Sequence, residues 1–138
     1  MELETPTCVH HVLEGPIQEF VLKATSRQTV DDLFDMIEEI LADGHARRDP
    51  TIIAGAYLLD SRVGMLPLNY AFNRARALSQ KFPTYPHSRT AVILTPSPLV
   101  KTVGFFLRAF GPTHIYSPDE RDQALAWLRA KEWPLSIP

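Results

Sequence analysis

The sequence predicts an α/β domain: a mixed, mostly parallel five-stranded sheet with four helices, in the order ββαβαβαβα. Three observations predict this fold. Short β-rich runs alternate with amphipathic stretches of helical spacing along the chain. The first two β runs are separated by Gly15-Pro16, a pair typical of a hairpin turn. Most of the 12 prolines stand at the boundaries of these runs, so the elements are cleanly divided.

The chain is expected to begin with an antiparallel hairpin of Cys8–Leu13 and residues 17–24. A helix should follow, beginning with Thr29 as its N-cap and ending at the Asp43-Gly44 pair. Apolar residues recur along it at helical spacing and predict one buried face: Val30, Leu33, Phe34, Ile37, Ile40 and Leu41.

The middle of the chain predicts one strand, one helix and a second strand. Residues 51–59 are apolar on both sides, as in a central strand buried on both faces. Residues 67–82 are expected to form a helix, and residues 89–95 the next strand. The helix has an apolar face made of Leu68, Ala71, Ala75, Leu78 and Phe82.

The last third predicts a helix, a short strand and a final helix. Ser97 is a suitable N-cap for a helix over residues 97–110, with Pro98 at its first position. A strand at residues 114–116 precedes a helix that opens with a capping box of Ser117 and Glu120. Because crossovers between parallel strands are right-handed, most later strands should be parallel.

Composition excludes several classes of function. The formal net charge is −2 and the pI about 6.2, which does not suit nucleic acid or an anionic membrane. No apolar run is long enough for stable membrane insertion. Cys8 is the single cysteine, and the acidic N-terminus lacks an apolar signal core. We therefore expect a cytoplasmic protein without disulfides.

Three features in this order resemble the STAS-like domains, and most closely the SpoIIAA-like group of small stand-alone bacterial proteins. The run Tyr57-Leu58-Leu59-Asp60-Ser61-Arg62-Val63 is an apolar strand ending in Asp beside a small polar residue. The paired Phe105-Phe106 lie on the third helix, and Ala124-Leu125-Ala126-Trp127-Leu128 on the last. The resemblance covers nearly the whole chain. It implies a single STAS-like domain over residues 1–138, with a folded core at about 7–133.

One departure from that family bears on function. Regulatory STAS proteins are anti-sigma factor antagonists, switched by phosphorylation of a Ser or Thr at the start of the helix after this strand. Here residues 63–70 read Val-Gly-Met-Leu-Pro-Leu-Asn-Tyr and hold neither residue type. We therefore expect no phosphorylation switch of this kind.

No residue pattern predicts catalysis, a metal or a cofactor. His10 and His11 are adjacent on a strand, so they point to opposite faces and cannot bind one metal. The chain has no Gly-x-Ser-x-Gly elbow and no glycine-rich phosphate loop. Cys8 shares a strand face with His10, but no third group is placed to orient such a pair. We expect a non-enzymatic protein.

Two regions are candidates for binding. Ligands of open α/β sheets bind beyond the carboxyl ends of parallel strands, which here are Asp60-Ser61-Arg62 and the loop of Ser97. Arg62 is a candidate partner for an anionic group at this edge, the alternative being a solvated side chain. The other candidate is an apolar patch of Phe105, Met65 and Leu66, unless the domain's own loops cover it.

These observations predict a non-enzymatic regulatory or protein-interaction module that pairs with a second copy of itself or with another protein. The alternative is a carrier of a small apolar molecule or lipid. That alternative follows from the structural similarity of the SpoIIAA-like group to the lipid-binding CRAL-TRIO domains, and it requires a cavity under Phe105, Met65 and Leu66.

Overall fold

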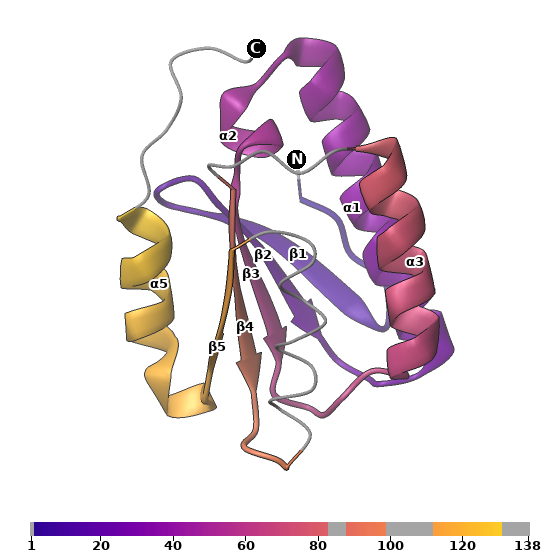
Figure 1. Ribbon diagram of the computed structural model, residues 1–138, viewed down its shortest axis with the longest axis vertical. Coiled ribbons are helices and arrows are strands. Elements are labelled where there is room, and N and C mark those ends of the chain that lie inside the picture. The colour runs from indigo at the N-terminus through magenta and orange to yellow at the C-terminus, as the bar shows by residue number, and fades with distance from the viewer. Residues whose placement is uncertain (1, 83–87, 99–111, 131–138) are drawn as a thin grey trace.

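The computed structural model describes residues 2–82, 88–98 and 112–130, and has the predicted mixed α/β architecture (Figure 1). Its strands are β1 (Cys8–Leu13), β2 (Ile17–Leu22), β3 (Ala56–Ser61), β4 (Arg89–Leu94) and β5 (Thr113–Tyr116). Its described helices are α1 (Arg27–Arg47), α2 (Pro50–Ile53), α3 (Leu68–Lys81), the 3-10 turn η2 (Pro118–Glu120) and α5 (Arg121–Arg129).

The five strands lie in the order β1-β2-β3-β4-β5. The pair β1–β2 is the predicted antiparallel hairpin, and every later neighbour is parallel. Successive right-handed crossovers that step in one direction place their helices on one face of the sheet. Accordingly, α1 and α3 cover one face and α5 the other (Figure 1).

The predicted bounds of the first helix are wrong at both ends. Its N-cap is Ser26, whose Oγ accepts a hydrogen bond from the Thr29 backbone N at 3.2 Å. The helix also continues through Gly44 to Arg47. A Cβ at Gly44 would lie 2.5 Å from Cγ2 of Ile52. This glycine therefore permits a close approach of α2 and does not end the helix.

The predicted strand over residues 51–59 is wrong in its first half, which contains the short helix α2. Asp49 is the N-cap, because its Oδ1 accepts a hydrogen bond from the Thr51 backbone N at 2.9 Å. Pro50 occupies the first helical position, where its missing N–H costs nothing. The strand itself begins only at Ala56.

The later elements follow the prediction. Helix α3 lies within residues 67–82, and β4 and β5 lie within a residue of their expected positions. The capping box is present, with Glu120 Oε1 accepting hydrogen bonds from the Ser117 backbone N and hydroxyl at 2.8 Å each. The helix predicted at residues 97–110 falls almost wholly outside the described residues.

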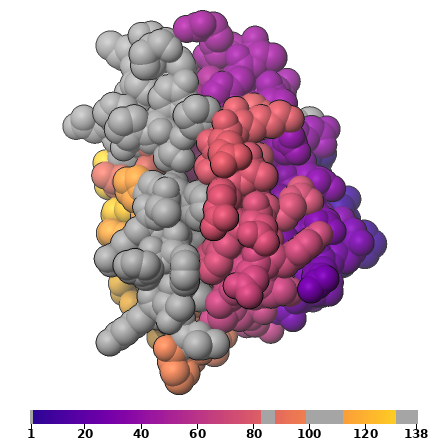
Figure 2. Space-filling model, turned by 45° about the vertical axis from the view of Figure 1, so that its right-hand side comes forward, coloured from indigo at the N-terminus to yellow at the C-terminus, as the bar shows by residue number. Residues whose placement is uncertain are grey.

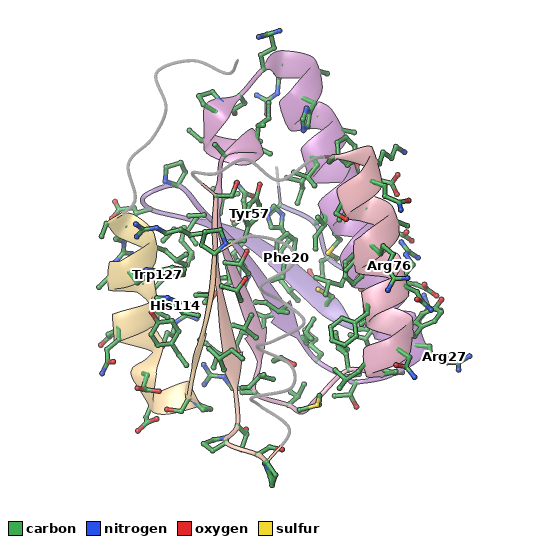
Figure 3. The ribbon with its side chains drawn as sticks, in the orientation of Figure 1. Phe20, Arg27, Tyr57, Arg76, His114 and Trp127 are labelled. Atoms are coloured by element: carbon green, nitrogen blue, oxygen red, sulfur yellow. The ribbon has the colours of Figure 1, made fainter. Side chains whose placement is uncertain are left out.

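The two faces of the sheet bury different clusters. Towards α5, side chains at alternate strand positions pack against the helix residues Ala124 and Leu128. None of these side chains is exposed, and the strand residues are Ile17, Ala56, Leu58, Ala91 and Ile93. The rings of His114 and Trp127 stack at the rim of this face, with 4.0 Å between their centroids (Figure 3). Towards α1, the buried cluster is Cys8, Phe20, Leu22, Leu33, Met36, Ile40 and Ile52. None of the described helices has the length and apolarity needed to span a bilayer.

Candidate functional site

Helix α3 is incompletely packed, and this sets it apart from the other long helices. Its apolar face is the one the sequence predicts, yet no residue of α3, all of which the structure describes, is buried. By contrast, α1 buries residues along its whole length, and α5 buries Ala124 and Leu128. Its apolar residues are partly buried, and Leu68 packs against the core residues Val92 and Leu94, but the face as a whole leaves space beneath it.

That space consists of two adjoining pockets between α1, α3 and the sheet, each partly open to the molecular surface, which we call the two lobes of the cavity. The larger lobe has a volume of about 210 Å³ and the smaller about 90 Å³. Both are lined by Leu33, Phe34, Leu59 and Ala75, so these four residues mark where the lobes meet.

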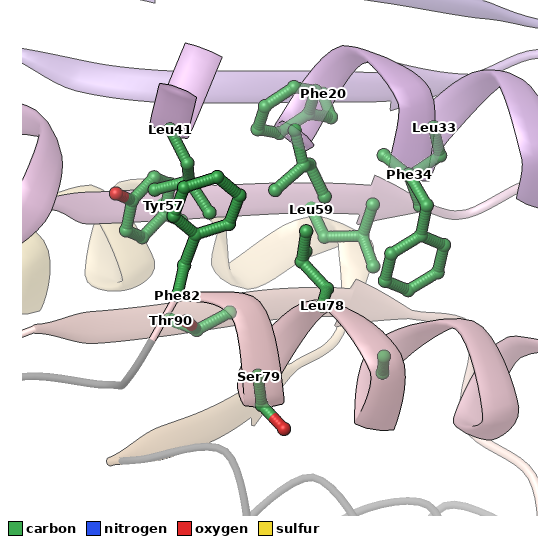
Figure 4. Close-up of a pocket in the computed structure, with 12 residues that line it drawn as sticks. Phe20, Leu33, Phe34, Leu41, Tyr57, Leu59, Leu78, Ser79, Phe82 and Thr90 are labelled. Atoms are coloured by element: carbon green, nitrogen blue, oxygen red, sulfur yellow. The ribbon is translucent and has the colours of Figure 1, made fainter. Parts of the chain in front are cut away.

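The larger lobe lies towards the amino ends of β3 and β4. Figure 4 shows Leu41, Tyr57, Phe82 and Thr90 gathered at one end of this lobe. The remaining described lining residues are Phe20, Leu33, Phe34, Ile37, Leu59, Ala75, Leu78 and Ser79. The smaller lobe lies towards the carboxyl ends and is lined by Leu33, Phe34, Leu59, Ser61, Met65, Leu66, Leu68, Ala71, Phe72, Ala75, Val92 and Leu94.

The polar groups of this lining are few, and most are engaged within the chain. The Tyr57 hydroxyl donates to the carbonyl oxygen of Ile52, at the end of α2. Burial raises the pKa of this phenol, so it remains neutral under ordinary conditions. The Ser79 hydroxyl donates to Arg76 O at 2.9 Å and points away from the other labelled side chains (Figure 4).

Polar and charged pairs join α1 to α3, and the two helices lie side by side on the molecular surface (Figure 2). We call these pairs the α1–α3 ladder. Its contacts are Tyr70 to Asp31 at 2.6 Å, Arg74 to Asp31 at 2.8 Å, Arg74 to Asp35 at 2.8 Å, and Lys81 to Glu38 at 2.5 Å.

The ladder side chains are partly exposed, and their contacts shift the pKa values of their partners in the expected directions. Lys81 lowers the pKa of Glu38, chiefly through their hydrogen bond. The hydrogen bond to Asp31 raises the pKa of Tyr70. Exposed pairs of this type contribute about 0.2–1 kcal/mol each, so the ladder can open at small cost.

A second polar cluster lies on the opposite face of the sheet, beside α5. Glu19 and Asp60 are buried there, at 4% exposure each. Asp60 accepts hydrogen bonds from the Arg62 Nε at 3.0 and 3.1 Å, and Glu19 Oε1 lies 3.0 Å from His11 Nδ1. The Arg121 guanidinium pairs with Glu19 and lies 3.9 Å from Asp60 Oδ2. Each buried carboxylate therefore has an arginine partner, which is how buried charge is usually tolerated.

The structure divides the predicted site residues between these two places. Ser61, Met65 and Leu66 line the smaller lobe of the cavity. Asp60 and Arg62 belong to the charged cluster on the other face, where Arg62 is turned back onto Asp60. Strand alternation explains the division, since successive side chains point to opposite faces.

The two remaining predicted residues stand apart from these clusters. Ser97 is exposed in the loop after β4, and Phe105 lies outside the described residues. The turn after Ser61 brings Met65 and Leu66 back over the sheet. In it, the Ser61 hydroxyl donates to Gly64 O at 2.5 Å, and Gly64 has a φ of 145°, which favours glycine.

Three residues of these candidate sites, Tyr57, Thr90 and Glu19, are not predicted from the sequence. Tyr57 and Thr90 line the cavity from the amino ends of their strands, away from the edge where ligands were expected. Strand alternation could have found them, because Tyr57 and Leu59 share a face. Glu19 could also have been singled out as the charged residue between apolar Ile17 and Val21 on one strand face.

The cysteine and histidines do not form a nucleophilic site. Cys8 is fully buried, and burial raises the pKa of its thiol to about 11, which keeps it protonated. His10 is buried on the α1 side, where its Nε2 lies 2.6 Å from Gln18 Oε1, whereas His11 faces α5. Over residues 2–82, 88–98 and 112–130, no cluster of three or more His, Cys, Asp or Glu side chains is placed to hold a metal ion.

Comparisons with known proteins found no similar chain. No family model matches the sequence, and neither the curated proteins nor the solved structures contain a match.

Proposed function

We propose that this chain is a non-enzymatic binding domain whose ligand is a small apolar molecule held between α1, α3 and the sheet. The observation that carries the proposal is the apolar cavity under a helix that buries none of its own residues. Ligand pockets are concave, mostly apolar and furnished with a few polar groups, as this one is. Of the two functions that the sequence predicts, the carrier is the one this cavity favours.

The volume of the larger lobe, about 210 Å³, is sufficient for a small ligand. An engineered apolar cavity of about 150 Å³ already binds benzene, so the larger lobe has room for a ligand of at least that size.

A neutral fluorescent probe tests the proposal directly. N-phenyl-1-naphthylamine should bind the purified chain with increased fluorescence, and Ala75→Phe should weaken it about tenfold or more by filling the junction of the lobes. The matched control is Ala77→Phe, on the same helix but exposed and facing the outer groove, which should leave the affinity within about twofold.

Circular dichroism of each variant verifies that the helices and strands are retained. Native mass spectrometry of the purified chain provides a second measurement, because a co-purified ligand adds mass that organic extraction removes. Probe binding that is absent from the original chain, or equal in the Ala75→Phe and Ala77→Phe variants, would contradict the proposed function.

A further inference from the structure

The described lining of the cavity offers no charge to a ligand. Among the residues that the structure describes, no charged side chain lines either lobe. Arg74 and Lys81 line the outer groove instead, where they are paired with carboxylates of α1. A ligand carboxylate held among these apolar side chains would lose hydration without gaining a counter-charge from them, which is unfavourable.

The hydroxyl groups of the lining are also engaged, with one exception. Those of Ser61, Ser79 and Tyr57 donate to backbone carbonyl oxygens of the chain itself. The Thr90 hydroxyl makes no hydrogen bond to another described residue, although its backbone N donates to Pro112 O at 3.0 Å. Thr90 thus offers one donor and one acceptor at the end of the larger lobe.

The cavity is elongated along the strands. Its lining includes Tyr57 at one end of β3 and Ser61 at the other. Four residues of a strand at about 3.3 Å each span about 13 Å. A C–C bond of about 1.5 Å advances an extended zigzag chain by about 1.3 Å, so this length suits a chain of roughly ten atoms, its polar head included.

We propose that the ligand is a neutral, single-headed linear molecule, with its hydroxyl or carbonyl group hydrogen-bonded to the side chain of Thr90 and its alkyl chain extended towards Met65 and Leu66. This inference rests on the proposed function. The inference adds the chemical class of the ligand, which is a medium-chain alcohol, aldehyde or ketone rather than a fatty-acid anion.

Three ligands with a common eight-carbon chain test the proposal by displacement of N-phenyl-1-naphthylamine: 1-octanol, octanoate and 1-chlorooctane. At pH 8, 1-octanol should bind about tenfold or more tightly than octanoate. As the pH falls, the apparent affinity of octanoate should rise with the fraction of protonated acid, whereas that of 1-octanol should not change.

The variant Thr90→Val is nearly isosteric and removes only the hydroxyl. It should weaken 1-octanol about fivefold to tenfold and leave 1-chlorooctane unchanged. The matched control is Ser79→Ala, which removes a lining hydroxyl that points away from the cavity and should change neither ligand. A Thr90→Val variant with the same preference for 1-octanol as the original chain would overturn the role of Thr90.

The outcomes separate this inference from the proposed function. If 1-chlorooctane and the probe bind but octanoate binds as tightly as 1-octanol, the ligand is not restricted to neutral molecules and only the further inference fails. If none of the three ligands displaces the probe, or the probe does not bind, the proposed function fails with it.

Discussion

Filling the cavity should stabilise the empty protein while it weakens ligand binding. Ala75 is the place to fill, because it lines both lobes and lies on a helix with no buried residue. The substitution Ala75→Leu adds three carbon atoms, each contributing about 0.8 kcal/mol when buried. Ordering the leucine side chain costs about 0.5–1 kcal/mol. The free energy of unfolding should therefore increase by about 1–2 kcal/mol.

The measurement is urea unfolding followed by circular dichroism, with and without a saturating neutral ligand. Without ligand, the Ala75→Leu variant should be more stable than the original chain, and its thermal midpoint should rise by about 4–8 °C. At the same ligand concentration the difference should shrink or reverse, because the stabilisation by a ligand increases with the logarithm of its affinity, and the variant binds it more weakly. The matched control Ala77→Leu places the same side chain on the exposed face of α3 and should change stability by less than about 0.5 kcal/mol.

The opposite sign of the stability change would contradict the cavity. Adding carbon atoms to a well-packed interior costs about 1–3 kcal/mol, since neighbouring side chains must move. If Ala75→Leu destabilises the ligand-free chain by that amount, the space beside Ala75 is already filled, and a ligand does not bind there.

Two further predictions concern the groups around the cavity. Arg74→Met removes the pairs with Asp31 and Asp35. In urea unfolding it should lower the free energy of unfolding by about 1 kcal/mol at low salt and by much less at 1 M salt. The comparison is Arg76→Met, at an exposed arginine of the same helix, and equal losses in both variants at every salt concentration would show that the ladder adds nothing. The pKa of His10 is lowered, chiefly by burial, so its contribution to stability is fully present above the ordinary value of 6.5 and is lost as the pH falls from there to the lower folded pKa. His10→Gln should therefore flatten the loss of stability as the pH falls below 6.5. An unchanged pH profile would mean that His10 is not the group responsible.

The sequence predicts the strands and long helices well because their periodicity is strong, and it fails where local signals compete. Ser26 and Thr29 are both good N-caps, and only the observed hydrogen bond between them decides that the helix begins after Ser26. Residues 51–59 form a continuous apolar run, in which periodicity alone cannot separate a strand from a buried helical turn. The Asp49-Pro50-Thr51 helix start was the signal that separates them.

The candidate site was only half predictable for a different reason. The rule that ligands bind beyond the carboxyl ends of parallel strands leads to Ser61, Met65 and Leu66, and these line the smaller lobe. The larger lobe depends on the distance between α3 and the sheet. The sequence pattern within a single helix or strand does not predict the distance between two such elements. The pairing of Glu19 with Arg121 joins residues far apart in the chain, so it also depends on the folded geometry.

The uneven packing of the two faces connects the stability of this chain with its proposed function. On the α5 side, Ala56, Ala91 and Ala124 allow a close approach that leaves the cluster without exposed area. On the other side, α3 is held over the cavity at its outer edge by the α1–α3 ladder, whose exposed pairs are individually weak. Its apolar face is only partly buried until something occupies the space below it. A ligand in the cavity would complete this layer of the core, so binding would stabilise α3 against the sheet. Release of the ligand would need only α3 and the ladder to move, while the packing on the α5 face stays intact.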